Sequence, residues 1–198
     1  SRPGVTHMEG FLFSTGVVAL AEIGDKTQLL SIVLAAKFRK PLPIILGILV
    51  APLVNHAAAG GLGAWIGSLL SPMTLRWVVG LSFLAMAVWV LIPDRLDEED
   101  TKLPALGVFS TTVVVFFLAE MGDKTQIATV ALASHYPSLA AVVLGTTLGM
   151  LLANVPAVYF GERAARLLPL PLVRMATALL FVGLGLATLL GVGADLGL

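Results

Sequence analysis

Long apolar runs separated by short polar breaks make up most of the chain. The runs cover about residues 10–36, 42–70, 73–92, 105–133, 138–161 and 171–193. A helix rises 1.5 Å per residue, so each run is long enough to cross the ~30 Å hydrocarbon core of a bilayer. Prolines and charged residues gather in the breaks, as expected for helix ends and loops. The pattern predicts an all-α integral membrane protein with six transmembrane helices.

Composition agrees with a lipid environment and limits the chemistry. Of the 198 residues, 58% are hydrophobic and 12% are charged. The 12 Lys and Arg residues balance the 12 Asp and Glu residues, so no surplus of positive charge indicates a nucleic-acid partner. The absence of cysteine excludes disulfides, thiolate metal sites and cysteine nucleophiles. Any metal site must use oxygen or imidazole ligands, and we expect no cofactor.

Charge placement predicts the orientation in the membrane. Basic residues gather in the first, third and fifth connections: Lys37, Arg39, Lys40, Arg95, Lys102, Arg163, Arg166 and Arg174. The second and fourth connections contain only Arg76. Because basic loops stay in the cytoplasm, both termini are expected outside it. The third connection also holds Asp94, Asp97, Glu98, Glu99 and Asp100, which we interpret as a solvated loop rather than a cation-gathering segment.

A heptapeptide occurs twice. Residues 22–28 read Glu-Ile-Gly-Asp-Lys-Thr-Gln and residues 120–126 read Glu-Met-Gly-Asp-Lys-Thr-Gln, so six of seven positions are identical at an offset of 98. Asn55 in the second run is echoed by Asn154 in the fifth. We interpret the chain as a tandem duplication. Each copy has three helices, an odd number, so the second enters the membrane from the opposite side and the copies form inverted repeats.

The repeat predicts the domain organisation. Residues 8–93 form the first three-helix repeat, 94–104 an acidic cytoplasmic linker, and 105–198 the second repeat. The polar residues 1–7 precede Met8 and are interpreted as the remnant of a tag. The apolar stretch after them lacks a preceding basic region, so we expect it to persist rather than to be cleaved as a signal peptide.

The two motifs place charge near the centre of the bilayer. Glu22 lies 12 residues, about 18 Å, into the first helix, and Glu120 lies 15 residues, about 22 Å, into the fourth. One charged side chain facing lipid at that depth costs about 2.5–3.5 kcal/mol, so these groups must face each other, a ligand or water. Glu22 and Asp25 share a helical face, as do Glu120 and Asp123. We expect the four carboxylates to converge.

An all-oxygen cluster suits a hard or borderline divalent ion such as Mn²⁺, Ca²⁺ or Mg²⁺. The predicted metal ligands are the four motif acids, Glu22, Asp25, Glu120 and Asp123. Four nearby amides are predicted as secondary ligands: Gln28, Gln126, Asn55 and Asn154.

Other polar and glycine positions receive supporting roles. Gly24 and Gly122 lie inside the motifs, where local unwinding of the helix would free backbone carbonyls for the ion. Thr27 and Thr125 are interpreted as bonding to the helix backbone rather than to the metal. His56 in the second helix has two open interpretations: a hydrogen-bonded packing residue, or a metal ligand or proton carrier.

The motif lysines allow a purely structural alternative. Lys26 follows Glu22 by four residues and Lys124 follows Glu120 by four, the favourable order for ion pairs within a helix. Two lysines against four acids leave a formal charge of −2, which one divalent cation or two protons would cancel. We therefore expect metal and protons to compete for one site. Glu22, Glu120, Lys26 and Lys124 are predicted to take part in proton coupling or ion pairing.

Two Glu-x-Gly-Asp-Lys-Thr motifs on the first and fourth of six helices resemble those of the transmembrane protein 165 family and its bacterial manganese-exporter relatives. The resemblance spans essentially the whole chain from Met8. It implies cation/proton exchange with the motif acids binding the metal, Mn²⁺ export in bacterial members, and Ca²⁺ or Mn²⁺ handling in the Golgi of eukaryotes. We expect the bacterial branch: an inner-membrane antiporter exporting Mn²⁺, with Ca²⁺ as the alternative cargo.

Two other functions stay open at this point. A divalent-cation channel would use the same binding site without tight coupling to protons. An intramembrane lipid-phosphate enzyme would want clustered Arg or a Ser nucleophile beside the acids, and neither motif has one. We expect a transporter rather than an enzyme, with the cation, protons and lipid bilayer as its partners.

Overall fold

The computed structural model describes residues 7–96, 102–161 and 169–191, and these residues form helices and connecting loops without a strand. The helices are α1 (His7–Glu22), α2 (Lys26–Phe38), α3 (Pro41–Leu69), α4 (Pro72–Trp89), α5 (Val108–Glu120), α6 (Lys124–His135), α7 (Leu139–Phe160) and α9 (Leu170–Leu190). The all-α class is confirmed. Some charged residues of the predicted connections lie outside the described ranges: the acids at 97–100 in the third connection and the arginines at 163 and 166 in the fifth.

Turn-forming residues set several helix ends. Pro41 and Pro72 begin α3 and α4, where the missing N–H is tolerated in the first turn. The Ser71 side chain caps α4 by accepting a hydrogen bond from the Thr74 backbone N–H at 3.2 Å. Ser138 caps α7 in the same way through Ala141, also at 3.2 Å. These caps lie in the breaks that the sequence indicated.

Four helices in the described ranges are long and apolar enough to cross a membrane: α3, α4, α7 and α9. A fifth, α5, is apolar but shorter. Large apolar side chains such as Leu62, Trp65 and Leu152 project from these helices and are exposed. Outward apolar surface on long apolar helices is expected where lipid is the solvent. The chain is an integral membrane protein.

The first and fourth apolar runs are each divided into two helices. α1 is followed by α2 after a break at residues 23–25, and α5 by α6 after a break at 121–123. Gly24 and Gly122 have φ angles of 78° and 77°, in the left-handed region that favours glycine. The local unwinding predicted at these glycines is confirmed. Each of these two apolar runs therefore contains two helices, with the break at the motif glycine.

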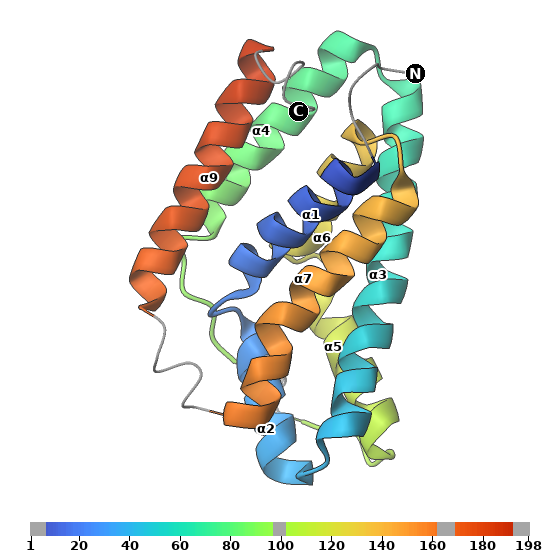
Figure 1. Cartoon of the computed structure of the whole chain (residues 1–198), viewed down its shortest axis with the longest axis vertical. Helices are drawn as coiled ribbons and strands as arrows, with labels where there is room; N and C mark the ends of the chain where they lie inside the picture. The colour runs from blue at the N-terminus through green and yellow to red at the C-terminus, as the bar shows by residue number, and fades with distance from the viewer. Residues whose placement is uncertain (1–6, 97–101, 162–168, 192–198) are drawn as a thin grey trace.

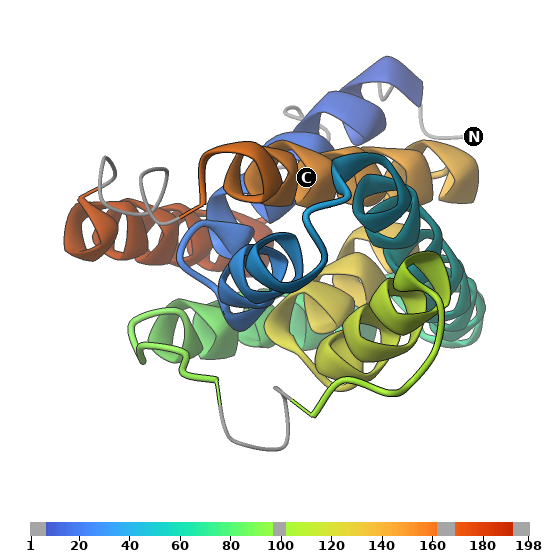
Figure 2. The ribbon, with the colours of Figure 1, turned by 90° about the horizontal axis from the view of Figure 1, so that it is seen from below.

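The divided helices pack against helices of the other half of the chain. α1 lies against α7, and α5 lies against α3 (Figure 1). Seen along the long axis, α4 and α9 pair at one side of the molecule (Figure 2). A Cβ atom at Gly47 of α3 would meet Thr112 of α5, and one at Gly145 of α7 would meet Ser14 of α1. Gly47 and Gly145 are 98 positions apart, and so are Ser14 and Thr112. The two close approaches therefore recur at the offset of the sequence repeat.

Candidate metal site

The two helix breaks put an acid at each side of an interruption. Glu22 ends α1 and Asp25 is the N-cap of α2; Glu120 ends α5 and Asp123 is the N-cap of α6. The Asp25 backbone N–H donates to the Glu22 carbonyl at 3.1 Å, and Asp123 donates to Glu120 at 3.2 Å. Each break is therefore a tight turn that holds its two carboxyl groups close together.

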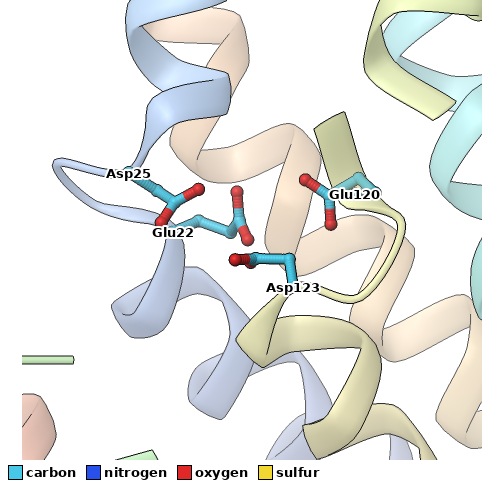
Figure 3. Close-up of side chains that lie close together, drawn as sticks. All are labelled: Glu22, Asp25, Glu120 and Asp123. Atoms are coloured by element: carbon cyan, nitrogen blue, oxygen red, sulfur yellow. The ribbon is translucent and has the colours of Figure 1, made fainter. Parts of the chain in front are cut away.

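The four carboxylates converge. One oxygen from each of Glu22, Asp25, Glu120 and Asp123 lies within 4.8 Å of the corresponding oxygens of the other three. The carboxylates extend toward one another from the two breaks (Figure 3). The exposed fractions are 0%, 1%, 0% and 6% in the same order, so the cluster is shielded by the surrounding helices. Four acids in this space demand positive charge or protons.

Threonine hydroxyls orient the two glutamates. Thr27 donates to Glu22 Oε2 at 2.6 Å, and Thr125 donates to Glu120 Oε2 at 2.8 Å. The predicted bonding of these threonines to the helix backbone is wrong. Residues five apart do not meet on a continuous helix, and the break brings them together. The motif therefore contains both partners of each hydrogen bond, but their pairing becomes apparent only when the turn between them is known.

Both glutamines fasten the breaks. Gln28 Oε1 accepts a hydrogen bond from the Gly24 N–H at 3.0 Å, and Gln126 Oε1 accepts one from Gly122 at 2.7 Å. Gln28 Nε2 donates to the Ala153 carbonyl at 3.0 Å. The amide groups thus satisfy backbone N–H groups that the interrupted helices leave without a helical partner.

The two asparagines also have hydrogen-bonding partners. Asn55 Oδ1 accepts from Gln126 Nε2, and Asn154 Oδ1 accepts from Ser31 Oγ at 3.0 Å. Asn154 Nδ2 donates to the Met150 carbonyl at 3.0 Å. All four predicted secondary ligands therefore hold helices and breaks in position, and their binding of a metal stays a prediction.

Lys124 forms ion pairs other than the one that the structural alternative assigned to it. Lys124 Nζ contacts Asp25 of the other motif, lies 2.7 Å from Asp94 Oδ2 and 3.9 Å from Asp123 Oδ1. Within the described ranges, neither Lys26 with Glu22 nor Lys124 with Glu120 forms an ion pair. The ion pairs of the purely structural alternative, each between a lysine and the glutamate four residues before it, are thus not formed in this part of the chain, because the helix is broken between them; a role of these residues in proton coupling stays a prediction.

Comparison with known proteins agrees with this geometry. Residues 10–98 and 108–195 match the family described as "Divalent cation/proton antiporter GDT1". The chain belongs to the GDT1 family. A Vibrio cholerae protein named "Putative manganese exporter" is 53% identical over 182 residues, 91% of this chain and 90% of the relative. GDT1-like protein 5 of Arabidopsis thaliana is 25% identical over 92% of this chain and 96% of its own length. No solved structure matches the chain significantly.

Membership of the GDT1 family confirms the resemblance drawn from the paired motifs. The family transports cations, so the chain is a transporter and not an enzyme. Both matched segments contain one motif and one helix break, which places the acidic cluster between the two halves that define this GDT1 protein.

Two charged residues beside the GDT1 cluster were not assigned to it from the sequence. Asp94, interpreted as part of a solvated loop, contacts Lys124. Arg174, assigned to the fifth connection, lies within α9, and its Nη2 donates to the Gly24 carbonyl at 3.5 Å. Asp94 is the first acid after the third apolar run, but nothing in the sequence tells it from its acidic neighbours.

His56 lies inside the protein without polar contacts. Its side chain is fully buried, and neither ring nitrogen has a hydrogen-bond partner within the described ranges. The hydrogen-bonded packing interpretation is therefore wrong. The other interpretation, that His56 is a metal ligand or proton carrier, stays a prediction. The group of side chains that could hold a metal ion consists of the four acids and does not include His56.

Proposed function

We propose that this GDT1 protein is a secondary transporter that exports a divalent cation in exchange for protons, with Mn²⁺ as the cargo and Ca²⁺ as the second candidate. The ion binds to Glu22, Asp25, Glu120 and Asp123. The observation that carries the proposal is the convergence of these four buried carboxylates from two interrupted helices. The family and the name of the Vibrio cholerae relative support the choice of cargo and mechanism.

The spacing of the carboxylates suits a single ion. Oxygens on opposite sides of Ca²⁺ lie about 4.6–5.2 Å apart, twice the usual bond length. The largest separation in the cluster, 4.8 Å, falls in this range. A smaller ion requires only a slight contraction. Oxygen ligands of this kind also suit Mn²⁺ and disfavour Cu⁺.

Several carboxylate oxygens have no donor from the protein. Within the described ranges, no hydrogen bond reaches Glu22 Oε1, Glu120 Oε1 or Asp25 Oδ2, although all three atoms are buried. Buried polar atoms are normally satisfied, so these oxygens favour a bound cation or proton. Because both would use the same oxygens, binding of one displaces the other. Exchange of a cation for protons follows from this competition.

We propose that the chain crosses the membrane six times as two inverted repeats. In this arrangement α1 with α2, and α5 with α6, each form one interrupted crossing. The recurrence of the Gly47 and Gly145 contacts at the repeat offset supports it. Interrupted helices near the membrane centre are common at transporter ion sites. The basic connections favour termini outside the cytoplasm, and the bacterial relative favours the inner membrane.

Flux through proteoliposomes tests the function. Purified protein is reconstituted with a pH dye inside, Mn²⁺ is added outside, and uptake is compared with Glu22→Gln and Glu120→Gln. We expect Mn²⁺ entry coupled to proton exit, lost in both variants, because each removes a charged ligand. Glu9→Gln changes an exposed glutamate in the first turn of α1 and serves as the matched control.

The outcomes separate the candidate functions. Mn²⁺ entry without proton exit would indicate a channel. No flux of Mn²⁺ or Ca²⁺ at any pH gradient would overturn transport. Full coupled flux in both glutamine variants would leave transport intact and remove the cluster as its site.

A further inference from the structure

Lys124 already supplies a positive charge to the proposed ion site. Its side chain is 2% exposed, and its ammonium contacts Asp25 while lying 3.9 Å from Asp123 Oδ1. Asp25 and Asp123 are two of the four proposed ligands, and they come from different motifs. A divalent cation that uses Asp25 must therefore compete with the ammonium for the same carboxylate. Lys124 acts as an internal counter-ion of the cluster.

A second acceptor for the ammonium is in contact with it. Asp94 Oδ2 lies 2.7 Å from Lys124 Nζ. Asp94 follows α4 and stands outside the four-acid cluster. Its side chain is 25% exposed, whereas those of Lys124 and Asp25 are nearly inaccessible. Asp94 therefore lies at an edge of the cluster that is open to the protein surface.

We propose that Asp94 and Lys124 form a charge relay that admits the cation: Lys124 leaves Asp25 when the cation binds and is then held by Asp94. The proposal rests on the proposed function of the cluster. The ammonium keeps one ion pair throughout, because it contacts both carboxylates before the exchange. Without Asp94 it would become a buried charge lacking a partner, which is strongly unfavourable. Asp94 is a positioning residue and does not bind the cation.

The relay is asymmetric between the two motifs. Lys26 is the counterpart of Lys124 in the repeat, and it forms no ion pair of this kind in the part of the chain that the structure describes. Asp94 belongs to the third connection, which the proposed topology places in the cytoplasm. An exporter receives its cargo from that side. The relay thus lies where the cation would enter.

Cation binding to the full-length protein tests the relay. Mn²⁺ affinity is titrated in detergent, with free Mn²⁺ followed by electron paramagnetic resonance. We expect Asp94→Asn to raise the Kd about tenfold, a typical coupling between residues in contact. Asp94→Glu keeps the carboxylate and should restore affinity, and Glu9→Gln should bind as the native protein does. In transport, Asp94→Asn should raise KM with little change in kcat.

A double-mutant cycle distinguishes the relay from direct attraction of the cation. Lys124→Met removes the competing ammonium, so the Kd should fall. In that background Asp94→Asn should have no further effect. An equal increase in Kd with and without Lys124 would overturn the relay, since Asp94 would then act on the cation itself. An unchanged Kd in Asp94→Asn alone would also overturn the relay. That variant keeps every proposed ligand, so it still tests the relay if Lys124→Met fails to fold.

Failure of the proposed function gives a different result. A native protein that binds no divalent cation removes both the transport site and the relay. Native binding with no effect of Asp94→Asn removes the relay alone.

Discussion

In each glutamate of the cluster, one carboxylate oxygen accepts a hydrogen bond from a threonine and the other oxygen accepts none within the described ranges. Thr27 and Thr125 donate to the Oε2 atoms of Glu22 and Glu120, whose Oε1 atoms have no donor within the described ranges. A carboxylate fixed in this way loses little rotational freedom when it binds an ion. The threonines of the motif therefore pre-organise ligands instead of acting as ligands themselves.

Removing one of these hydroxyls tests pre-organisation. Thr27→Val keeps the branched shape and loses the hydrogen bond to Glu22. A hydrogen bond to a charged group contributes about 1.5–3 kcal/mol, so Mn²⁺ affinity should fall about tenfold or more. Calorimetric titration of the purified protein measures the change. Thr27→Ser retains the hydroxyl and should bind almost as tightly as the native protein; equal losses in both variants would show that packing, not the hydroxyl, matters.

The residue types of the site were predictable from the sequence, but their pairing was not. Carboxylates deep in an apolar run must meet partners, and this argument identified the four acids that converge. The pairing of Lys124 with Asp25 joins residues 99 positions apart, so it depends on how the two halves pack. Asp94 illustrates the same limit, because its contact with Lys124 depends on the course of the loop after α4.

At the scale of helices, the apolar pattern located every long helix but concealed the two breaks. Hydropathy falls at both motifs because of their charged residues, but a polar motif inside a long apolar run does not by itself show that the helix is interrupted, since the break depends on backbone conformation. A glycine with φ near +77°, and a glutamine whose side-chain oxygen accepts a hydrogen bond from that glycine's own N–H, form each break. Both features were visible as motif residues. The glycines predicted the unwinding, whereas the hydrogen bonds from their N–H groups to the glutamines depend on the folded turn.

Close packing of α1 against α7 gives a prediction about stability. A Cβ atom at Gly149 would lie 2.7 Å from the Thr15 carbonyl oxygen and 2.9 Å from the Ala19 nitrogen, so backbone would have to move. Gly149→Ala should lower the free energy of unfolding by about 1–3 kcal/mol, the usual cost of overpacking. Thermal unfolding in detergent measures the loss.

Gly61 provides the matched control for this change. It lies within α3, and a Cβ atom there would meet nothing within 4 Å. Gly61→Ala should therefore be neutral or stabilise the helix by about 0.5–1 kcal/mol. Similar losses at Gly61 and Gly149 would contradict the packing argument and indicate a general intolerance of alanine.

The whole molecule is organised by a repeat in which each half supplies two acids, and a transporter gains from this arrangement. Movement of one half relative to the other changes access to the ion from either side while the ligands stay near the centre. The GDT1 family match consists of two segments, residues 10–98 and 108–195, and each segment contains one motif. Inverted repeats are one arrangement that permits alternating access, and the topology proposed above is open to direct measurement.

The absence of cysteine makes that measurement simple, because a single introduced thiol is the only one to react. Leu42 and Leu106 follow the first and third connections, whereas Met73 and Leu139 follow the second and fourth, and all four side chains are exposed. Each is replaced by cysteine, and spheroplasts of bacterial cells are treated with a membrane-impermeant maleimide. Inverted repeats with outside termini predict labelling at positions 73 and 139, and at 42 and 106 only after the membrane is opened. Labelling of 106 and 139 from the same side of intact cells would contradict an interrupted single crossing by α5 with α6, and with it the placement of that break within the membrane.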